Sequence, residues 1–309
     1  MRLLRTVESM QTECQGGIVA VGNFDGVHIG HQSIVDAIDA MAVRLGGPRV
    51  ILTFDPHPLQ LLKPESAPTP LSWPERKAEL LGQLGVDVLV AYPTTKELLG
   101  LDYRQFFDDV IVGKLKAQGM VEGANFFFGK GRQGNVEKLA ELCSRDQIEL
   151  EVVTLHGEED EVISSSRIRK LIGEGDLEIA NRLLTAPYRI RGLVQKGDQR
   201  GRTLGFPTAN LVDCPVLAPG FGVYAGWVLV GGERVQAAIH VGPNPTFGVE
   251  QAKVEVHLLD WSQDLYGQWL EVEFHSRVRG IQAFKSANAL KEQLRLDVEE
   301  VRRRTADQG

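Results

Sequence analysis

Residues 22–32 read Gly-Asn-Phe-Asp-Gly-Val-His-Ile-Gly-His-Gln and directly follow the apolar run Ile18–Val21. A short apolar run that ends in glycine is typical of a buried strand. The residues beyond the stretch have helical spacing, because Ile34, Ile38 and Met41 fall on one face. Residues 22–32 therefore predict a turn from a strand into a helix, which is the repeating unit of an α/β domain.

The rest of the first half continues this pattern. Helical stretches separate three more apolar runs, Val50–Phe54, Val86–Tyr92 and Leu150–Leu155. Strands that alternate with helices predict a doubly wound parallel sheet with helices on both faces. Ligands of such sheets bind beyond the carboxyl ends of the strands. We therefore expect the polar loops that follow these strands to form the ligand site.

From about Tyr188 the chain changes to the two-residue period of strands. The expected strands start with the alternating run at residues 190–195 and continue at Val223–Val230, Val235–Val241, Lys253–Leu259 and Trp269–Phe274. Five or six such strands predict a small closed antiparallel barrel, because closure removes exposed edges. A helix with one apolar stripe, from about Ser286, is expected to close the chain.

Length and composition agree with two domains. The chain has 309 residues, of which 43% are hydrophobic and 24% are charged. The change of period near residues 185–187 predicts one domain at 1–185 and a second at 186–309.

Charge and composition also exclude some classes of partner and location. A formal net charge of −7 disfavours a nucleic-acid partner. No apolar run is long enough to predict a membrane span or a signal peptide. The three cysteines are far apart and predict neither a disulfide framework nor a Cys-X-X-Cys motif, which favours the cytoplasm.

The first chemical pattern is the pair His28 and His31, with Gly30 between them, at the expected start of a helix. Free N–H groups and positive partial charge at a helix N-terminus suit phosphate. Two imidazoles add donors that stabilise charge on phosphate oxygens as pyrophosphate leaves, and Gly30 allows a close approach of the backbone. An ordinary helix start, or half of a zinc site, would have the same spacing. The other five histidines show no second pair, which disfavours zinc.

Two further segments have the character of ligand loops. Ser164, Ser165 and Ser166 precede Arg167 and Arg169, and three hydroxyls before two arginines exceed what a helix cap requires. Residues 129–134 match the Gly-X-Gly-X-X-Gly pattern of dinucleotide-binding turns. That fingerprint belongs in the first strand-to-helix turn, which residues 22–32 occupy. An ordinary glycine-rich ligand loop is therefore favoured over a nicotinamide site.

The chain resembles the bacterial bifunctional riboflavin kinase/FMN adenylyltransferases, also called FAD synthetases. The resemblance rests on GNFDGVHIGHQ at 22–32, TFDPHP at 53–58, the glycine-rich loop at 129–134, ISSSRIR at 163–169, GRTLGFPTANL at 201–211, GPNPTF at 242–247 and VEVH at 254–257. These motifs occur in the family's order over nearly the whole chain. The resemblance implies an N-terminal nucleotidyltransferase domain of the HxGH class and a C-terminal flavokinase barrel.

For the first domain, the resemblance implies that His28 and His31 contact the ATP phosphates during adenylyl transfer. It implies that the rest of the ATP site consists of Gly22, Asn23, Phe24, Ser165 and Arg169. It also implies a loop for the flavin or its phosphate at Asn125, Gly129 and Arg132. Phe127 stands where arginine is frequent in the family.

For the barrel, the resemblance implies that Glu255 is the kinase base and that Thr208 and Asn210 bind Mg²⁺. Contacts to nucleotide or flavin are implied at Gly201, Arg202, Gly205, Phe206 and Pro207. A neutral hydroxyl that attacks a phosphate needs a base, and hard oxygen ligands suit Mg²⁺. The plain alternative for Glu255 is an outward residue on an alternating strand. Gly280 stands where an acidic residue is common.

The sequence thus predicts an enzyme that converts riboflavin to FMN and FMN to FAD, using ATP and Mg²⁺ in both steps, as a monomer or weak oligomer. The phosphate of FMN is already anionic, so adenylyl transfer needs positioning and charge stabilisation but no base. Two alternatives remain open. One is a nicotinamide oxidoreductase that uses residues 129–134, and the other is a flavin-binding regulator without turnover.

Overall fold

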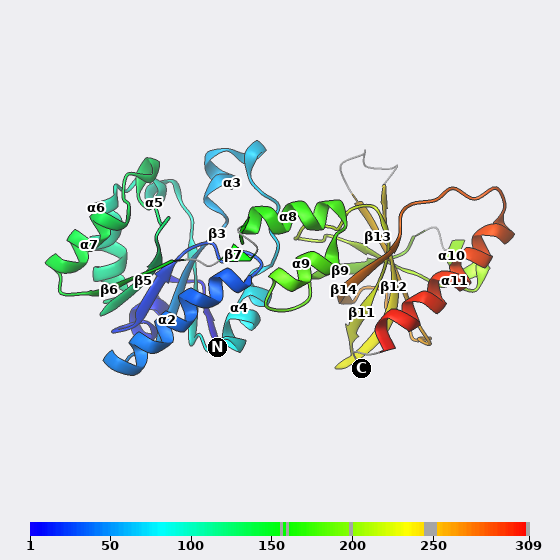
Figure 1. Ribbon diagram of the computed structural model, residues 1–309, viewed down its shortest axis with the longest axis horizontal. Coiled ribbons are helices and arrows are strands. Elements are labelled where there is room, and N and C mark those ends of the chain that lie inside the picture. The colour runs from blue at the N-terminus through cyan, green and yellow to red at the C-terminus, as the bar shows by residue number, and fades with distance from the viewer. Residues whose placement is uncertain (155–156, 159–160, 198–199, 244–251, 307–309) are drawn as a thin grey trace. The chain divides into compact units, whose positions relative to one another are not determined.

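The computed structural model describes residues 1–154, 157–158, 161–197, 200–243 and 252–306 (Figure 1). They form two compact units. Unit 1 comprises Met1–Thr69 and Trp73–Ser164, and unit 2 comprises Pro70–Ser72 and Ser165–Gly309. Over the described ranges, no helix is both long enough and apolar enough to cross a membrane.

Unit 1 contains a six-stranded parallel sheet in the order β1-β4-β3-β2-β5-β6. Its strands are β1 (Arg2–Leu4), β2 (Ile18–Val21), β3 (Arg49–Asp55), β4 (Val88–Pro93), β5 (Gly119–Gly123) and β6 (Glu149–Val153). The predicted parallel sheet is confirmed. The sequence did not reveal β1, which has three residues, or β5, which begins and ends in glycine and so has weak strand propensity.

Helices cover both faces of this sheet. The helical segments are α1 (Val7–Glu13), α2 (Ile29–Leu45), α3 (Pro58–Leu62), η1 (Pro64–Ser66), α4 (Pro74–Gln83), α5 (Lys96–Gly100), α6 (Tyr103–Phe106), the π-helix η2 (Phe107–Lys114), η3 (Lys130–Arg132) and α7 (Val136–Arg145). A separate two-stranded sheet consists of β7 (Gly157–Glu158) and β8 (Glu161–Val162). Residues of α1, η2 and α7 share one core with Val19. On the opposite face, the side chains of Ile18 from β2 and Met41 from α2 both lie against Gly119 of β5.

Strands β2 and β5 separate at the point where the strand order reverses. Their ladder has two pairs, Ile18 with Gly119 and Val19 with Met120. Beyond it, the Val21 N–H donates to Oε1 of Glu122 at 2.8 Å. Burial raises the pKa of Glu122 well above its ordinary value of 4.5. A buried acid therefore satisfies the last N–H of β2 at the switch point, where ligands bind in sheets of this type.

Unit 2 contains a closed antiparallel barrel in the order β10-β13-β12-β11-β14-β9. Its strands are β9 (Arg189–Gln195), β10 (Ala209–Val212), β11 (Gly222–Val230), β12 (Glu233–Pro243), β13 (Ala252–Leu258) and β14 (Trp269–Arg279). The predicted barrel is confirmed. Its sixth strand is β10, which the sequence analysis treated as part of the motif at 201–211 and not as a strand. Its helices are α8 (Ser165–Glu174), α9 (Leu177–Leu183), α10 (Arg200–Leu204) and α11 (Ala287–Thr305).

The predicted terminal helix is α11, whose N-cap Ser286 accepts a hydrogen bond from the Ala289 N–H. Val301 of α11 is fully buried and packs against Ala225 of β11. Ala238 of β12 joins this cluster from outside the barrel. Because side chains alternate along a strand, residues at even positions near 238 on β12 face outward. Residues 244–247 of the 242–247 motif lie outside the described residues.

We expect Gly226→Ala to destabilise the barrel. A methyl group on Gly226 would lie 2.0 Å from the Glu273 carbonyl oxygen, where the β11–β14 register shifts. Overpacking of this kind costs about 1–3 kcal/mol, and urea unfolding of the whole chain measures the loss. Gly173→Ala in α8 is the matched control, since a methyl group there meets nothing within 4 Å. A free energy of unfolding equal in both variants would contradict this close approach.

Candidate active sites

The turn between β2 and α2 has an unusual backbone and a buried interior. Phe24 and Val27 adopt φ angles of 45° and 43°, and Gly26 adopts 81°. Phe24 is 3% exposed and Val27 is fully buried. Non-glycine residues with positive φ are strained, and such strain concentrates at functional sites. At Gly22, a Cβ would lie 3.0 Å from the Phe24 ring, so the ring needs a glycine beside it.

The two histidines of this turn contact each other. His28 is the N-cap of α2, and its N–H donates to Nδ1 of His31 at 3.2 Å. Their rings stack with centroids 3.6 Å apart, and the Phe24 ring packs against His31 at 4.8 Å. Because Nδ1 of His31 accepts a hydrogen bond, Nε2 carries its proton. His31 can therefore donate to a ligand through Nε2.

Burial keeps both rings neutral. It lowers the pKa of His28 from 6.5 to about 4. It also lowers the pKa of His31 well below 6.5, and the neighbouring His28 and Lys77 lower it further, because a proton on His31 would repel positive charge on either of them. At neutral pH the pair therefore offers hydrogen-bond donors without formal charge.

Gly30 makes room for the His28 ring. A Cβ on Gly30 would lie 3.1 Å from Nδ1 of His28 and 3.6 Å from the Ile163 carbonyl oxygen. Nδ1 of His28 is buried and has no hydrogen-bond partner among the residues that the structure describes. The glycine between the two histidines thus has a packing role that the sequence did not indicate.

The loops after β2 and β3 meet, as the sheet topology predicts. Oγ1 of Thr53 donates to the Asn23 carbonyl oxygen at 3.1 Å, and Nδ2 of Asn23 lies 3.0 Å from Nε2 of His57. Lys77 of α4 reaches the same place, because its Nζ donates to the Asn23 carbonyl oxygen at 2.5 Å and lies 3.3 Å from Oγ1 of Thr53. Sequence reasoning missed Lys77, since it lies 24 positions beyond Thr53 in a helix with ordinary surface charges. A cation therefore lies beside the neutral imidazoles.

The glycine-rich loop closes on itself. Phe128 and Gly134 exchange two backbone hydrogen bonds of 3.1 and 2.9 Å, with η3 between them. Gly129 has φ 73°, and a Cβ there would lie 2.5 Å from the Tyr103 nitrogen. A dinucleotide-binding turn runs directly from a strand into a helix, so this closed loop does not support the nicotinamide alternative. Asn125 precedes the loop and is exposed.

Arg132 lies on the exposed side of this loop. Its guanidinium lies 4.6 Å from the centroid of the Phe127 ring. The Phe127 ring thus has the Arg132 guanidinium over its face. A cation therefore remains at the loop.

The serine-arginine motif lies at the boundary of the two units. Ser164 ends unit 1, while Ser165 and Arg169 lie on α8 and belong to unit 2 by packing. Both side chains are partly buried.

The barrel brings Thr208, Asn210 and the strand of Glu255 together. Asn210 of β10 is paired with Glu255 of β13. Oδ1 of Asn210 is buried without a hydrogen-bond partner among the described residues. A Cβ on Gly197 would lie 2.4 Å from the Asn210 amide, so the loop after β9 covers it. Thr208 is partly buried just before β10.

The remaining predicted kinase residues form the segment that leads into β10. Gly201 accepts from the Phe206 N–H at 2.9 Å, and Gly205 donates to the Arg202 carbonyl oxygen at 3.2 Å. Nδ1 of His257 lies 2.7 Å from the Pro207 carbonyl oxygen. The segment thus docks on β13, two residues from Glu255.

Glu255 faces outward from β13, which is also expected if it is only a surface residue and not the kinase base. It nevertheless belongs to a cluster of charged and titratable groups. Its Oε1 lies 2.7 Å from Nζ of Lys253, and its Oε2 lies 3.6 Å from Nδ1 of His240. The Glu255 side chain is 27% exposed. No group of three or more His, Cys, Asp or Glu side chains able to hold a metal occurs in the described ranges.

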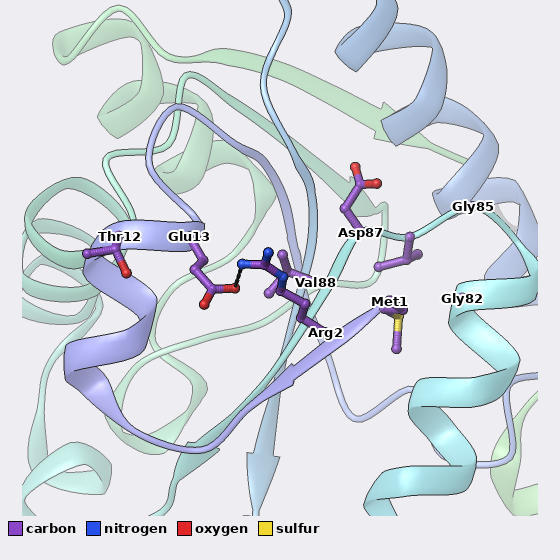
Figure 2. Close-up of a pocket in the computed structure, with 9 residues that line it drawn as sticks. Met1, Arg2, Thr12, Glu13, Gly82, Gly85, Asp87 and Val88 are labelled. Atoms are coloured by element: carbon purple, nitrogen blue, oxygen red, sulfur yellow. Dashed lines mark ion pairs between the residues drawn. The ribbon is translucent and has the colours of Figure 1, made fainter.

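Two surface pockets are lined by none of the predicted site residues. One of about 600 Å³ opens at the amino ends of β1 and β4, where Arg2 pairs with Glu13 at 2.7 Å (Figure 2). The sites above use the carboxyl ends of the strands, so this pocket is at the opposite edge of the sheet. The other, of about 510 Å³, lies between β14 and α11 beside Arg279 and Asp297.

Comparisons with known proteins agree with the two-unit architecture. A family model described as FAD synthetase matches residues 10–167, and one described as riboflavin kinase matches residues 184–305. Similar relatives are the bifunctional riboflavin kinase/FMN adenylyltransferases of Bacillus subtilis, Pseudomonas fluorescens and Escherichia coli K12. The Bacillus subtilis protein is 36% identical, and the match covers 92% of this chain and 90% of that protein. The Pseudomonas fluorescens and Escherichia coli proteins are 35% and 32% identical, and each match covers 96% of this chain and 96% of the relative.

A solved structure is also similar over its whole length. It is described as a macrolide-efflux protein from Streptococcus pneumoniae. Its chain is 31% identical with a TM-score of 0.88, and the match covers 98% of this chain and 99% of that one. The similarity therefore extends to the fold of the entire chain.

The burial of His28 makes stability depend on pH. The folded pKa is about 4 and the ordinary value is 6.5, so between them the unfolded chain binds a proton that the folded chain excludes. Stability therefore falls as pH drops from 6.5 towards 4. His28→Gln should reduce the difference in unfolding free energy between about pH 7.5 and about pH 4.5 by on the order of 2 kcal/mol. Urea titrations at both pH values measure it, and an unchanged difference would mean that His28 titrates freely.

Proposed function

The chain belongs to the family of bifunctional riboflavin kinase/FMN adenylyltransferases, and from this premise we propose that it performs both reactions, one in each domain. The domain with the β2–α2 turn adenylylates FMN to FAD, and the barrel phosphorylates riboflavin to FMN. We place the functional boundary near residues 185–187, which the family matches support, since one ends at residue 167 and the next starts at 184. The observation that carries the proposal is that each unit has its own phosphate-handling set, His28, His31 and Lys77 in one and Asn210 with Glu255 in the other.

In adenylyl transfer, an oxygen of the FMN phosphate attacks the α-phosphorus of ATP. The bond from that phosphorus to the bridging oxygen breaks, and pyrophosphate leaves with the electron pair. Nε2–H of His31 and the N-terminus of α2 donate to phosphate oxygens, and Lys77 supplies positive charge. Buried donors are worth more than donors in water because little solvent screens them. Ser165, Arg169, Asn125, Gly129 and Arg132 complete the proposed binding set.

In the kinase reaction, the ribityl hydroxyl of riboflavin attacks the γ-phosphorus of ATP and loses its proton to Glu255, while ADP leaves. The residues fit Mg²⁺, because Oδ1 of Asn210 is buried without a partner in the described residues and the Thr208 hydroxyl supplies a second hard oxygen. These oxygens would hold Mg²⁺, which would supply charge neutralisation of the phosphates. The backbone of Gly201, Arg202, Gly205, Phe206 and Pro207 shapes the loop beside the phosphates.

Chromatography of the products from purified protein with riboflavin, ATP and Mg²⁺ tests the proposal. FMN should form first and FAD second. ATP left unconsumed with riboflavin present would favour the regulator alternative. Tight NAD binding without FMN formation would favour the oxidoreductase.

The two activities should separate by mutation. Replacing His28 and His31 with alanine should lower FAD formation by about 10²-fold or more, while FMN accumulates, because the pyrophosphate loses its donors. Glu255→Gln should lower riboflavin phosphorylation by about 10²–10⁴-fold and spare adenylylation of added FMN, because the hydroxyl loses its base. Equal loss of both activities in either variant, with the fold intact by circular dichroism, would refute the partition.

Lys77 should contribute charge to adenylyl transfer alone. We expect Lys77→Gln to lower kcat/KM for FAD formation by about 10–100-fold, since the neighbouring imidazoles are neutral, and Lys77→Arg to retain most of it. Lys96→Gln on α5 is the control, because that lysine is exposed. Riboflavin phosphorylation by the same preparations should not change. If Lys77→Gln forms FAD at the rate of Lys96→Gln, the assignment of Lys77 fails.

A further inference from the structure

His240 lies directly across the strand pair from the proposed kinase base. The β12–β13 register pairs His240 with Glu255, and β10 pairs Asn210 with Glu255 from the other side. The three side chains therefore form a row on neighbouring strands, with Glu255 in the middle. Sequence reasoning did not single out His240, because a lone histidine on an alternating strand has no distinctive spacing.

The ring of His240 is held against Glu255 by the strand itself. A Cβ on Gly242 would lie 2.6 Å from Cε1 and 3.1 Å from Nε2 of His240, so the ring lies over the bare Cα of Gly242. Nδ1 of His240 is buried and has no hydrogen-bond partner in the described part of the chain. Its distance of 3.6 Å to Oε2 of Glu255 is just beyond hydrogen-bond range. Catalytic hydrogen bonds are often long before substrate binds.

The carboxylate is therefore approached from two sides. Nζ of Lys253 lies 2.7 Å from Oε1, and the imidazole faces Oε2. A carboxylate that serves as a base must present one lone pair to the substrate hydroxyl, and fixed partners on its other lone pairs set that orientation.

We propose that His240 is a positioning residue for Glu255, and that its neutral imidazole, together with Lys253, orients the carboxylate towards the ribityl hydroxyl of riboflavin. The inference rests on the proposed kinase function of the barrel. His240 does not touch the phosphoryl group, and the proton of the hydroxyl goes to Glu255. Protonation of His240 would convert the contact into an ion pair and make Glu255 a weaker base.

The charges that face His240 come from three elements. Glu255 and Lys253 belong to β13, Arg279 to β14 and Asp297 to α11. Arg279 and Asp297 form an ion pair at 2.7 Å, so they largely neutralise each other. Burial lowers the pKa of His240 below 6.5, against the raising effect of Glu255. The imidazole is thus neutral at pH 7 and gains its proton only below pH 6.5.

The test is the pH profile of riboflavin phosphorylation by the full chain and by His240→Asn and His240→Leu. An asparagine amide can still donate to Glu255 but does not titrate, so kcat near pH 8 should stay within about twofold of the wild type. Leucine offers no donor, and kcat should fall about tenfold. As pH falls below 6.5, kcat/KM of the wild type should decline before that of His240→Asn. His275→Asn is the control, because His275 is another partly buried barrel histidine whose pKa burial lowers.

Adenylylation of added FMN should be unchanged in every variant, and circular dichroism of each variant should match that of the wild type, which shows that the barrel is folded. Coincident pH profiles of the wild type and His240→Asn would overturn the inference while the kinase function stands. Equal kcat for the leucine and asparagine variants near pH 8 would overturn it as well. If the wild type does not phosphorylate riboflavin, the proposed function fails and this inference falls with it.

Discussion

The first active site depends on the cost of folding a tight, buried turn at the end of β2. Phe24 and Val27 adopt positive φ, which costs about 1–3 kcal/mol at each residue. Their side chains are almost completely buried, and burying an apolar side chain of this size contributes about 1.5–3 kcal/mol. The two effects are of similar size, so the packed ring and the strained backbone need each other. The result is that His28, the N-cap of α2, has its imidazole inside the protein.

Burial of the imidazoles decides how this site can work. Neutral rings donate hydrogen bonds in a place with little water, where each bond is strong, but they add no net charge. Charge must then come from side chains that approach from other elements, and Lys77 does so through the carbonyl oxygen of Asn23. The barrel solves the opposite problem. Its reaction needs a base that the substrate hydroxyl can reach, and the Glu255 side chain is 27% exposed with Lys253 beside it.

What the sequence predicted and what it missed have a common physical cause. Continuous apolar runs predicted β2, β3 and β4, and the contiguous HxGH stretch predicted the histidine site, since all of that information is local. β1 and β5 escaped notice because short or glycine-bounded segments become strands only when neighbours pair with them. Lys77, Glu122 and His240 act through partners on other elements, and no spacing along the chain reveals such contacts. The glycine-rich pattern at 129–134 was ambiguous until its closed backbone was known.

The two reactions therefore place different demands on the solvent around their sites. Adenylyl transfer starts from the FMN phosphate, an anion that needs no base. A buried site with neutral hydrogen-bond donors is therefore unaffected by pH over the range where His28 and His31 stay uncharged. Phosphorylation starts from a neutral hydroxyl whose proton must leave through Glu255, so its site has to stay open to water on one side. A single pocket cannot be both closed around buried imidazoles and open to water around a carboxylate base. Two separate units resolve that conflict, each with the burial that its own chemistry requires.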